Sequence, residues 1–419
     1  MNIALITYHF FSLKGGVSHT LESLYKCFKH KDHNLYIFNP YQRGKNIFRF
    51  PLRNTKKLNI FKILKNRWIY YFFLLSVWKL FKDKKIDLSN RLKMILYLFL
   101  IPFHTLRNFY NLIFIYPYLK KLNIDIIFGM GTGPSLTLTY HLSKLLNKKV
   151  VSLSHGNDFL IQAPISFKSL YIRYLDKIIL SNNKMLKLIK RIHNLDENQL
   201  VAINRGIILK DYNIKESKSE LRNEFNIPKD QFVLLSVGRQ VERKKFFLVI
   251  KAVDKIIKNN PSIDIKYYLI GTGPFSSKLK ELTKKLKLVK YIEFLGSCET
   301  DIRNKFYKLS DVFLMPSISK ANSIEGFGIS FLEANYYKIP VIGAISGGII
   351  EAIIDGKTGL LVKPNDLNDL VEKIIFLYEN KELRNKMGEI GNNRIIKEFD
   401  WNKIVDDYIN TFKRVLEFN

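Results

Sequence analysis

Short apolar runs that end near glycine and lead into a helical pattern recur along most of this chain. The first covers 2–8 and passes through Gly15 and Gly16 into apolar residues at helical spacing as far as Lys31, and the second covers 33–38. Strands that alternate with helices in this way predict a doubly wound, parallel α/β sheet. A glycine pair at such a turn serves either tight packing or contact with a phosphate.

The alternation occurs twice, which predicts two domains. In the first half it resumes after an interruption, with strands at 125–128, 149–154, 177–180 and 199–203. In the second half the predicted strands are 232–237, 263–270, 291–295, 311–315, 340–343 and 359–362. A chain of 419 residues also exceeds the size of one ordinary core. We therefore predict a domain at 1–208, a linker at 209–231 and a second domain at 232–397.

The positive charge is concentrated in one segment. The chain has 68 Lys or Arg against 37 acidic residues, a net charge of +31, and between Arg43 and Lys121 there are 18 basic and two acidic residues. A basic balance indicates nucleic acid, an anionic membrane or a phosphate-bearing substrate. Here the basic residues are interleaved with long apolar runs rather than with aromatic stacking platforms, so no nucleic-acid partner is expected.

The same segment, 43–121, replaces the α/β alternation with aromatic and apolar sequence. The run 68–80 is shorter than the about 20 residues that cross a bilayer, and the run 94–118 is interrupted by His104 and Arg107. We expect helices that cover the sheet and lie in a membrane interface, with basic side chains on anionic lipid. A buried helical insert and a transmembrane span are the alternatives.

Cysteine content and the first residues indicate the compartment. Cys27 and Cys298 are the only cysteines, one in each predicted domain, which argues against a disulfide framework and fits a reducing cytoplasm. The first residues lack a basic segment and a cleavage site, and are interpreted as a strand rather than a signal peptide. We expect a peripheral protein at the cytoplasmic face of the membrane.

The stretch 323–340 places two carboxylates around a loop that leads into a helix. Glu325 opens the loop, Gly326 and Gly328 leave its backbone bare, and Glu333 falls about two turns further on. Bare amides at a first helical turn favour an anionic or hydroxyl-rich ligand, and carboxylates accept from the hydroxyls of a sugar or ribose. The alternative is an ordinary helix N-terminus with acidic residues favoured by its dipole.

Basic side chains and a histidine follow two predicted strands. Arg239 comes just after 232–237 and Lys244 opens the next helix, so that a guanidinium and an ammonium can hold a diphosphate from two directions. His155 follows 149–154, at the edge where open α/β sheets bind ligands. A solvated basic face and a structural histidine are the respective alternatives.

Two cofactor patterns are missing. Gly271-Thr-Gly273 imitates a dinucleotide fingerprint, but the third glycine is absent and Pro274 intrudes, so NAD is not expected. No Asp-x-Asp pair occurs, so the two-carboxylate handle for a metal-bound diphosphate is missing and no metal is expected.

Taken in order, these segments resemble the retaining glycosyltransferases of family 4, the glycosyl transferases group 1. The resemblance is strong over 232–369 and weaker over 1–16 and 149–206. It rests on Ser236-Val-Gly-Arg239 with Glu242-Arg-Lys244, Ile270-Gly-Thr-Gly-Pro274, Asp311-Val-Phe-Leu-Met-Pro-Ser317, the stretch from Glu325 to Glu333, and Gly347-Gly348 followed by Asp355-Gly-Lys-Thr-Gly-Leu-Leu-Val362. It implies the GT-B fold, an α/β architecture of two doubly wound, Rossmann-like domains that face a central cleft.

The resemblance implies a metal-independent donor site in the second domain. Arg239 and Lys244 would hold the diphosphate, Glu333 would accept from the ribose hydroxyls, and Gly273 would belong to the same nucleotide site. The donor implied is a UDP or GDP sugar, used as a substrate rather than held permanently as a cofactor.

The sugar itself would be held from both domains. Glu325 and the amides around Phe327 and Gly328 would contact it from the second domain, and His155 from the first. Gly16 would approach the phosphates across the cleft. Glu325, His155, Arg239 and Lys244 are therefore the residues expected to act in catalysis.

The chain departs from the family pattern at two places and resembles it at one more. Lys245 stands where the family commonly has glycine, which predicts a shifted helix start, and the insert 43–121 lies in the half that usually receives the acceptor. Residues 398–419 resemble the closing helix that returns to the first domain.

The predicted activity is transfer of a hexose, with retention, from a nucleotide diphosphate sugar to a lipid-linked or lipid-anchored saccharide in polysaccharide or lipopolysaccharide biosynthesis. A sugar-nucleotide epimerase on the same fold is one alternative. A catalytically silent membrane-binding module is the other.

Overall fold

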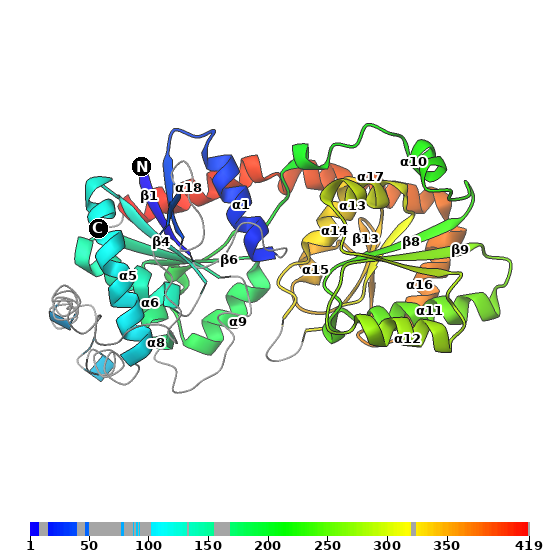
Figure 1. Ribbon diagram of the computed structural model, residues 1–419, viewed down its shortest axis with the longest axis horizontal. Helices are drawn as coiled ribbons and strands as arrows, with labels where there is room; N and C mark the ends of the chain where they lie inside the picture. The colour runs from blue at the N-terminus through cyan, green and yellow to red at the C-terminus, as the bar shows by residue number, and fades with distance from the viewer. Residues whose placement is uncertain are drawn as a thin grey trace. The chain divides into compact units, whose positions relative to one another are not determined.

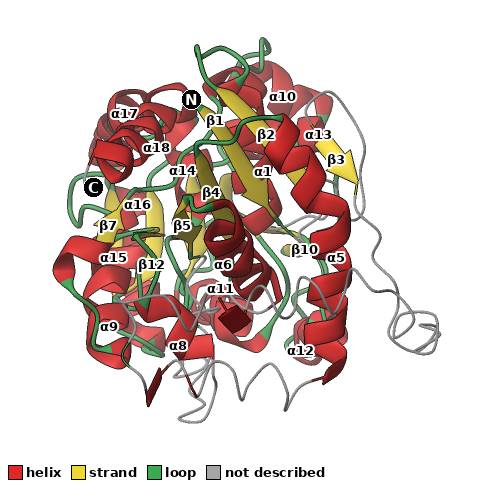
Figure 2. Ribbon diagram, turned by 90° about the vertical axis from the view of Figure 1, so that its left-hand side faces the viewer, coloured by secondary structure: helices red, strands yellow, loops and turns green. Residues whose placement is uncertain are grey.

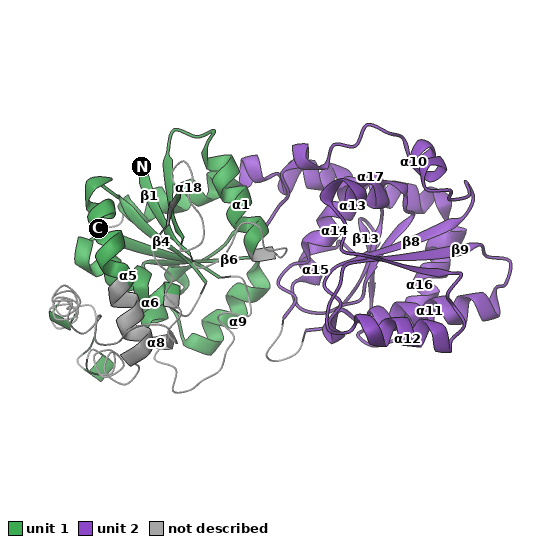
Figure 3. Cartoon of the chain, in the orientation of Figure 1, with its two compact units in different colours: residues 1–204, 405–419 green, residues 205–404 purple. Residues whose placement is uncertain are grey.

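Two parallel sheets account for the two sets of predicted strands. The computed structural model describes residues 1–7, 16–39, 47–49, 77–78, 87, 89–90, 92, 102–131, 134–154, 168–319 and 324–417. The chain divides into unit 1, Met1–Asn204 with Val405–Asn419, and unit 2, Arg205–Ile404 (Figure 3). In each unit helices lie on both faces of the sheet (Figures 1 and 2).

Unit 1 contains a seven-stranded sheet in the order β3-β2-β1-β4-β5-β6-β7. Its strands are β1 (Asn2–Ile6), β2 (Asn34–Asn39), β3 (Ile47–Arg49), β4 (Ile126–Met130), β5 (Lys149–Leu153), β6 (Lys177–Leu180) and β7 (Leu200–Ala202). All pairs are parallel, with Leu5 opposite Ile37 on one side and Phe128 on the other. The chain order reverses between β1 and β4, which makes that gap the switch point of the sheet.

The helices of unit 1 cover both faces of this sheet, so its central strands are apolar on both sides. In Figure 1, α1 and α18 lie on one face and α5, α6 and α9 on the other. The described helices are α1 (Gly16–Phe28), α5 (Pro102–Lys121), α6 (Pro134–Leu146), α8 (Lys168–Arg173), α9 (Asn183–His193), the 3-10 turn η2 (Glu197–Gln199) and α18 (Trp401–Glu417).

Unit 2 contains a six-stranded parallel sheet in the order β10-β9-β8-β11-β12-β13. Its strands are β8 (Phe232–Val237), β9 (Ile265–Ile270), β10 (Ile292–Gly296), β11 (Val312–Met315), β12 (Val341–Ala344) and β13 (Gly359–Val362). Successive strands run outward from β8 on one side and from β11 on the other. The switch point of this sheet therefore lies between β8 and β11.

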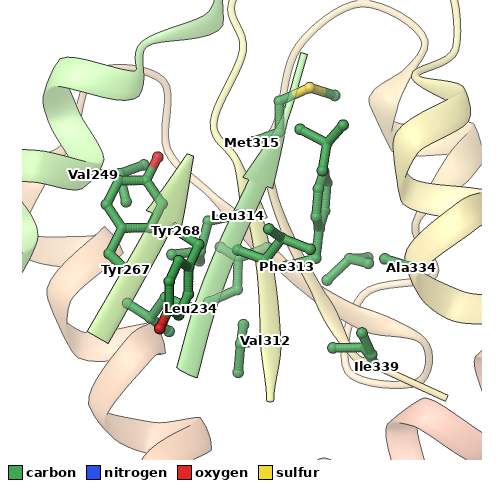
Figure 4. Packing of buried hydrophobic residues seen from close by; sticks show 14 of the residues in the cluster. Leu234, Val249, Tyr267, Tyr268, Val312, Phe313, Leu314, Met315, Ala334 and Ile339 are labelled. Atoms are coloured by element: carbon green, nitrogen blue, oxygen red, sulfur yellow. The ribbon is translucent and has the colours of Figure 1, made fainter. Parts of the chain in front are cut away.

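The helices of unit 2 enclose an apolar core. Figure 4 shows its centre, where Leu234, Phe313 and Tyr267 pack between the strands and the flanking helices. The helices are η3 (Leu209–Tyr212), α10 (Lys218–Glu224), η4 (Glu242–Lys244), α11 (Phe246–Asn259), α12 (Ser276–Lys285), α13 (Thr300–Leu309), α14 (Ile329–Tyr336), α15 (Ile349–Ala352), α16 (Leu367–Glu379) and α17 (Lys381–Glu398).

The segment predicted as a linker, 209–231, is part of unit 2 rather than a separate connection. It forms η3 and α10, and Tyr212, Leu221 and Ile227 are buried in the core of that unit. Their spacing shows no helical or strand period, which is why the pattern suggested a linker. The prediction failed because short, irregular segments can bury single side chains without a periodic pattern.

The chain passes between the units at two places, and these places are hydrogen-bonded to each other. Ile207 N donates to Phe399 O at 2.9 Å, and Trp401 N donates to Ile207 O at 3.1 Å. Gly206 lies so close to this contact that a Cβ there would stand 2.1 Å from Phe399 O. Residues 398–404 stay with unit 2, so the return to unit 1 begins at Val405 rather than at 398.

Most of the insert at 43–121 lies outside the described residues, including the run 68–80 apart from 77–78. The described parts include the helix α5 and the edge strand β3. Helices were expected in this segment, but the strand was not. Within the described ranges, no helix is both long enough and apolar enough to cross a bilayer.

Candidate functional site

The loops after β8 and β11 meet at the switch point of the unit 2 sheet. The first loop carries Arg239 and η4, and the second runs from Met315 through Glu325 to the start of α14. A backbone hydrogen bond joins the loops, because Ile318 N donates to Arg243 O at 2.8 Å. The sequence therefore brings its two most distinctive motifs together at one edge of one sheet.

Three charged side chains form the centre of this site. Lys244 Nζ lies 2.7 Å from Glu325 Oε2, and Arg243 Nη1 lies 2.5 Å from the same oxygen. Lys244 also contacts Met315 Sδ at 2.9 Å. Met315 lies at the end of β11 (Figure 4). The exposed fractions of the Lys244 and Glu325 side chains are 10% and 11%, whereas that of Arg243 is 22%. We call these three residues the Glu325 cluster.

Burial and charge oppose each other in the Glu325 cluster. Burial alone would raise the pKa of Glu325, but the ammonium of Lys244 and the guanidinium of Arg243 outweigh it and lower that pKa to about 2. Burial lowers the pKa of Lys244, while Glu325 acts in the opposite direction. The carboxylate is therefore ionised at neutral pH and shared by two cations.

Backbone and hydroxyl contacts fix the loop that carries Glu325. Glu325 N donates to Ser319 Oγ at 3.1 Å, and Ser319 N donates to Ser346 Oγ at 2.8 Å. Gly348 N donates to Glu325 O at 2.9 Å, and Gly347 packs so closely that a Cβ there would lie 2.7 Å from the same oxygen. Close packing against the Glu325 loop therefore explains the glycine at 347.

The N-terminus of α14 presents unpaired amides beside the Glu325 cluster. Gly328 is the N-cap and has φ +86°, which favours glycine, and a Cβ there would lie 2.7 Å from the Phe331 ring. Among the described residues, the N–H groups of Phe327, Gly328, Ile329 and Ser330 donate to no acceptor. Such groups at a helix N-terminus attract an anion. The Phe327 side chain itself is buried and packs on Phe399.

Glu333 lies in a different environment from Glu325. Its Oε1 accepts from Tyr212 and its Oε2 from Tyr307, each at 2.7 Å, and Arg303 lies 3.6 Å from Oε1. Burial, then the charge of Glu333, raises the pKa of both phenols, so they stay protonated and donate. Both oxygens of the carboxylate expected at the ribose thus accept hydrogen bonds from tyrosines, and these partners were not predicted.

Arg239 lies in the loop after β8, and Gly273 lies in the loop after β9, which packs against it. Arg239 is exposed directly beyond the end of that strand. Gly273 packs against the neighbouring backbone, since a Cβ there would lie 2.4 Å from Gln240 O, and its N–H donates to Ser276 Oγ at 2.9 Å. A structural requirement therefore accounts for Gly273 without a ligand.

Lys245 takes the backbone conformation that makes glycine common at this position. It has φ +55° and ends η4, and α11 begins at Phe246. The helix start therefore does not remove Lys244 from the site, because Lys245 adopts the left-handed conformation itself. Within the described ranges, no group of three or more His, Cys, Asp or Glu is arranged to hold a metal ion.

The remaining predicted site residues, Gly16 and His155, belong to unit 1. Gly16 is the first residue of α1. His155 lies outside the described residues.

Arg243 is the main residue of the site that the pattern did not single out. It stands inside the motif between Glu242 and Lys244, and its charge was the available signal. A 3-10 turn rather than an α-helix at this point is what directs both Arg243 and Lys244 to one carboxylate.

Comparison with known proteins identifies the family of this chain. The model of the family described as glycosyl transferases group 1 matches residues 217–394. An uncharacterized glycosyltransferase of Methanocaldococcus jannaschii is 34% identical over 289 residues, which are 68% of this chain and 74% of that protein. This chain belongs to the glycosyl transferases group 1. The predicted family, with relatives of the family 4 type, is confirmed.

Two further relatives have named activities. The N-acetyl-alpha-D-glucosaminyl L-malate synthase of Bacillus anthracis is 26% identical over 301 residues, 71% of this chain and 76% of that protein. A GDP-mannose-dependent monoacylated alpha-(1-6)-phosphatidylinositol monomannoside mannosyltransferase of Corynebacterium glutamicum is 30% identical over 188 residues, 44% of this chain and 48% of that protein.

Solved structures confirm the GT-B fold of this glycosyltransferase. A glycosyltransferase of Rickettsia africae has a TM-score of 0.74 at 20% identity and covers 100% of this chain and 99% of its own. Anabaena HepE in complex with UDP has a TM-score of 0.71 at 16% identity, over 99% of this chain and 100% of its own.

Proposed function

We propose that this group 1 glycosyltransferase moves a hexose from a UDP or GDP sugar, with retention, to a lipid-linked or lipid-anchored saccharide. The observation that carries the proposal is the Glu325 cluster beside the unpaired amides of α14, at the switch point of unit 2. Buried cations and helix amides on one edge suit a diphosphate. The UDP complex of Anabaena HepE supports a nucleotide donor, without deciding between UDP and GDP.

Each site residue has a place in the proposed donor complex. Arg239 and Lys244 hold the diphosphate, with Gly16 approaching it from unit 1. Glu325 holds the sugar hydroxyls together with the amides of Phe327 and Gly328 and with His155. Gly273 shapes the nucleotide site by keeping the loops after β8 and β9 close together.

Glu333 is proposed to meet the ribose by exchanging partners. Its oxygens accept from the phenols of Tyr212 and Tyr307, and a ribose hydroxyl that approaches would replace one of these bonds with an equivalent one. The exchange keeps the buried carboxylate hydrogen-bonded in both states, as a buried charge requires.

In the proposed reaction the acceptor hydroxyl attacks the anomeric carbon from the face that the diphosphate leaves. A bond forms between the acceptor oxygen and the anomeric carbon, and the bond from that carbon to the phosphate oxygen breaks with its electron pair on the oxygen. The acceptor proton passes to the departing diphosphate. Lys244, Arg239 and the α14 amides stabilise the charge that develops there. No covalent intermediate with the protein is involved.

The acceptor and the location rest on composition and on relatives. The net charge of the insert at 43–121, together with its apolar runs, favours an anionic membrane surface at the cytoplasmic face. The Corynebacterium relative is named for a phosphatidylinositol monomannoside, which supports a lipid-anchored saccharide. Metal ions are not assigned a role, because cationic side chains serve the diphosphate.

Thermal shift with UDP, GDP and ADP sugars tests the donor proposal, since a ligand that binds only the folded state raises the melting temperature. One class of donor should stabilise the wild type, and Arg239→Ala should lose turnover more than donor affinity. Transfer to lipid-linked saccharides in vesicles, with the anomeric configuration of the product read by NMR, then tests acceptor and retention. Binding without transfer or hydrolysis would favour a silent module, and conversion of the donor into an epimer would favour an epimerase.

A further inference from the structure

The Glu325 cluster contains a cation, Arg243, that was not expected at the diphosphate site. Arg243 Nη1 and Lys244 Nζ both contact Glu325 Oε2, at 2.5 Å and 2.7 Å. The other oxygen, Oε1, accepts no hydrogen bond from the described residues. Two donors thus compete for one oxygen while its neighbour stays open to a hydroxyl of the substrate.

The charges explain why the third member matters. Lys244 and Glu325 alone would form a buried pair whose charges cancel, and a neutral pair attracts a diphosphate weakly. Arg243 makes the total charge of the three side chains +1. Because the carboxylate is shared, Lys244 is bound less tightly to it and its ammonium can turn toward a phosphate oxygen.

Geometry also distinguishes Arg243 from the exposed lysines nearby. Its carbonyl accepts from Ile318 N, and its guanidinium reaches across the switch point to the Glu325 side chain. A single residue of the loop after β8 therefore holds the loop after β11 through both its backbone and its side chain. Lys251, on the exposed side of α11, makes no such contact.

We propose that Arg243 is a positioning residue for the donor diphosphate, which acts by sharing the Glu325 carboxylate so that Lys244 remains available to the phosphates. This inference rests on the proposed function. It assigns Arg243 an indirect role, in contrast to a guanidinium that binds the phosphate directly.

A double-mutant cycle on nucleotide binding separates these two roles. UDP and GDP, without a sugar, are titrated by calorimetry against wild type, Arg243→Gln, Glu325→Gln and the double variant. Arg243→Gln should weaken binding about tenfold, the size of one lost charge-assisted interaction. In the Glu325→Gln background the same change should have little effect, because no carboxylate then competes for Lys244.

Two further variants complete the experiment. Arg243→Lys keeps a cation on Glu325 and should stay within about threefold of wild type, whereas Lys251→Gln removes the same charge at a distance and should bind normally. An equal loss from Arg243→Gln in both backgrounds would mean direct phosphate contact and would overturn the inference. So would a loss no greater than that of Lys251→Gln. If neither nucleotide binds the wild type, the proposed function fails together with the inference.

Discussion

At the scale of single residues, the site depends on a carboxylate held ionised in a buried place. Glu325 would be costly to bury alone, and its pKa of about 2 reflects how strongly Lys244 and Arg243 stabilise the ionised form. Loss of the carboxylate leaves Lys244 and Arg243 without the anion that they share. The consequence is measurable as stability as well as activity.

Replacement of Glu325 by Gln should lower the free energy of unfolding by about 3 kcal/mol at pH 7, the cost of breaking a buried ion pair. The folded pKa is depressed below the ordinary 4.5, so this contribution is complete above pH 4.5 and disappears as the pH falls toward 2. Urea unfolding of both proteins at several pH values should therefore show a difference that narrows on acidification. Glu372→Gln, at an exposed position, is the control, and a difference that is constant with pH would contradict the assignment.

Substitution by glycine should have opposite effects on stability at Lys245 and at Lys251. With φ +55°, Lys245 carries a left-handed strain of about 1 kcal/mol that glycine avoids. Lys251 lies within α11, where glycine costs about 1 kcal/mol relative to good helix formers. Lys245→Gly should thus be more stable than Lys251→Gly in denaturant titration, and the reverse order would show that the left-handed conformation is not adopted.

At the scale of elements, Glu333 connects three segments that are distant in sequence. It lies on α14 and accepts from Tyr212 at the end of η3 and from Tyr307 on α13, so one carboxylate ties the segment that was predicted as a linker to α13 and α14. The rings add packing, with Tyr307 stacked on Tyr337 at 6.1 Å between centroids. The phenols hold these segments in one arrangement because each satisfies half of a buried charge.

Tyr212→Phe removes one of these hydrogen bonds without removing the ring. We expect a loss of about 1–3 kcal/mol, since the buried carboxylate oxygen loses its hydrogen bond from Tyr212 while Arg303 lies 3.6 Å away. Tyr336→Phe is the matched control, because its ring packs on Tyr212 but its hydroxyl makes no hydrogen bond with the described residues. Equal melting temperatures for the two variants would argue against the Glu333 contact.

At the scale of the whole molecule, the end of the chain completes the core of unit 1. Tyr408 and Phe412 of α18 are fully buried and pack edge-on against Phe128 of the central strand β4, with Phe412 at 5.1 Å between ring centroids. Lys31 adds an ion pair to Asp406 at 2.6 Å. Unit 1 is therefore built from both ends of the sequence.

Phe412→Ala should destabilise the protein by about 3–5 kcal/mol through the cavity it leaves beneath β4. Lys413→Ala, on the exposed side of the same helix, should have an effect near zero. Calorimetry should show the loss in a transition assigned to unit 1, while unit 2 unfolds as before because its core contains none of these residues. A shift of both transitions by the same amount would mean that the units do not unfold separately.

The sequence by itself determined the elements whose pattern is local and periodic. The strands 177–180, 232–237 and 359–362 were predicted with the bounds that the structure has, because buried parallel strands are short, apolar on both faces and ended by turns. Lys244 was predicted as a site residue because it lies near the carboxyl end of a strand, and Glu325 because it opens a glycine-rich loop that leads into a helix. That repetition predicted two doubly wound sheets, and the resemblance to family 4 implied the GT-B fold.

Only the tertiary structure decided which side chains share a contact. The pairing of Arg243 with Glu325 joins residues 82 positions apart, and that of Tyr212 with Glu333 joins residues 121 apart. No local pattern encodes such partners, because hydrogen bonding and burial depend on how the loops pack rather than on their period. The membership of 209–231 and the placement of β3 were decided in the same way, by packing against neighbours that a window of sequence does not contain.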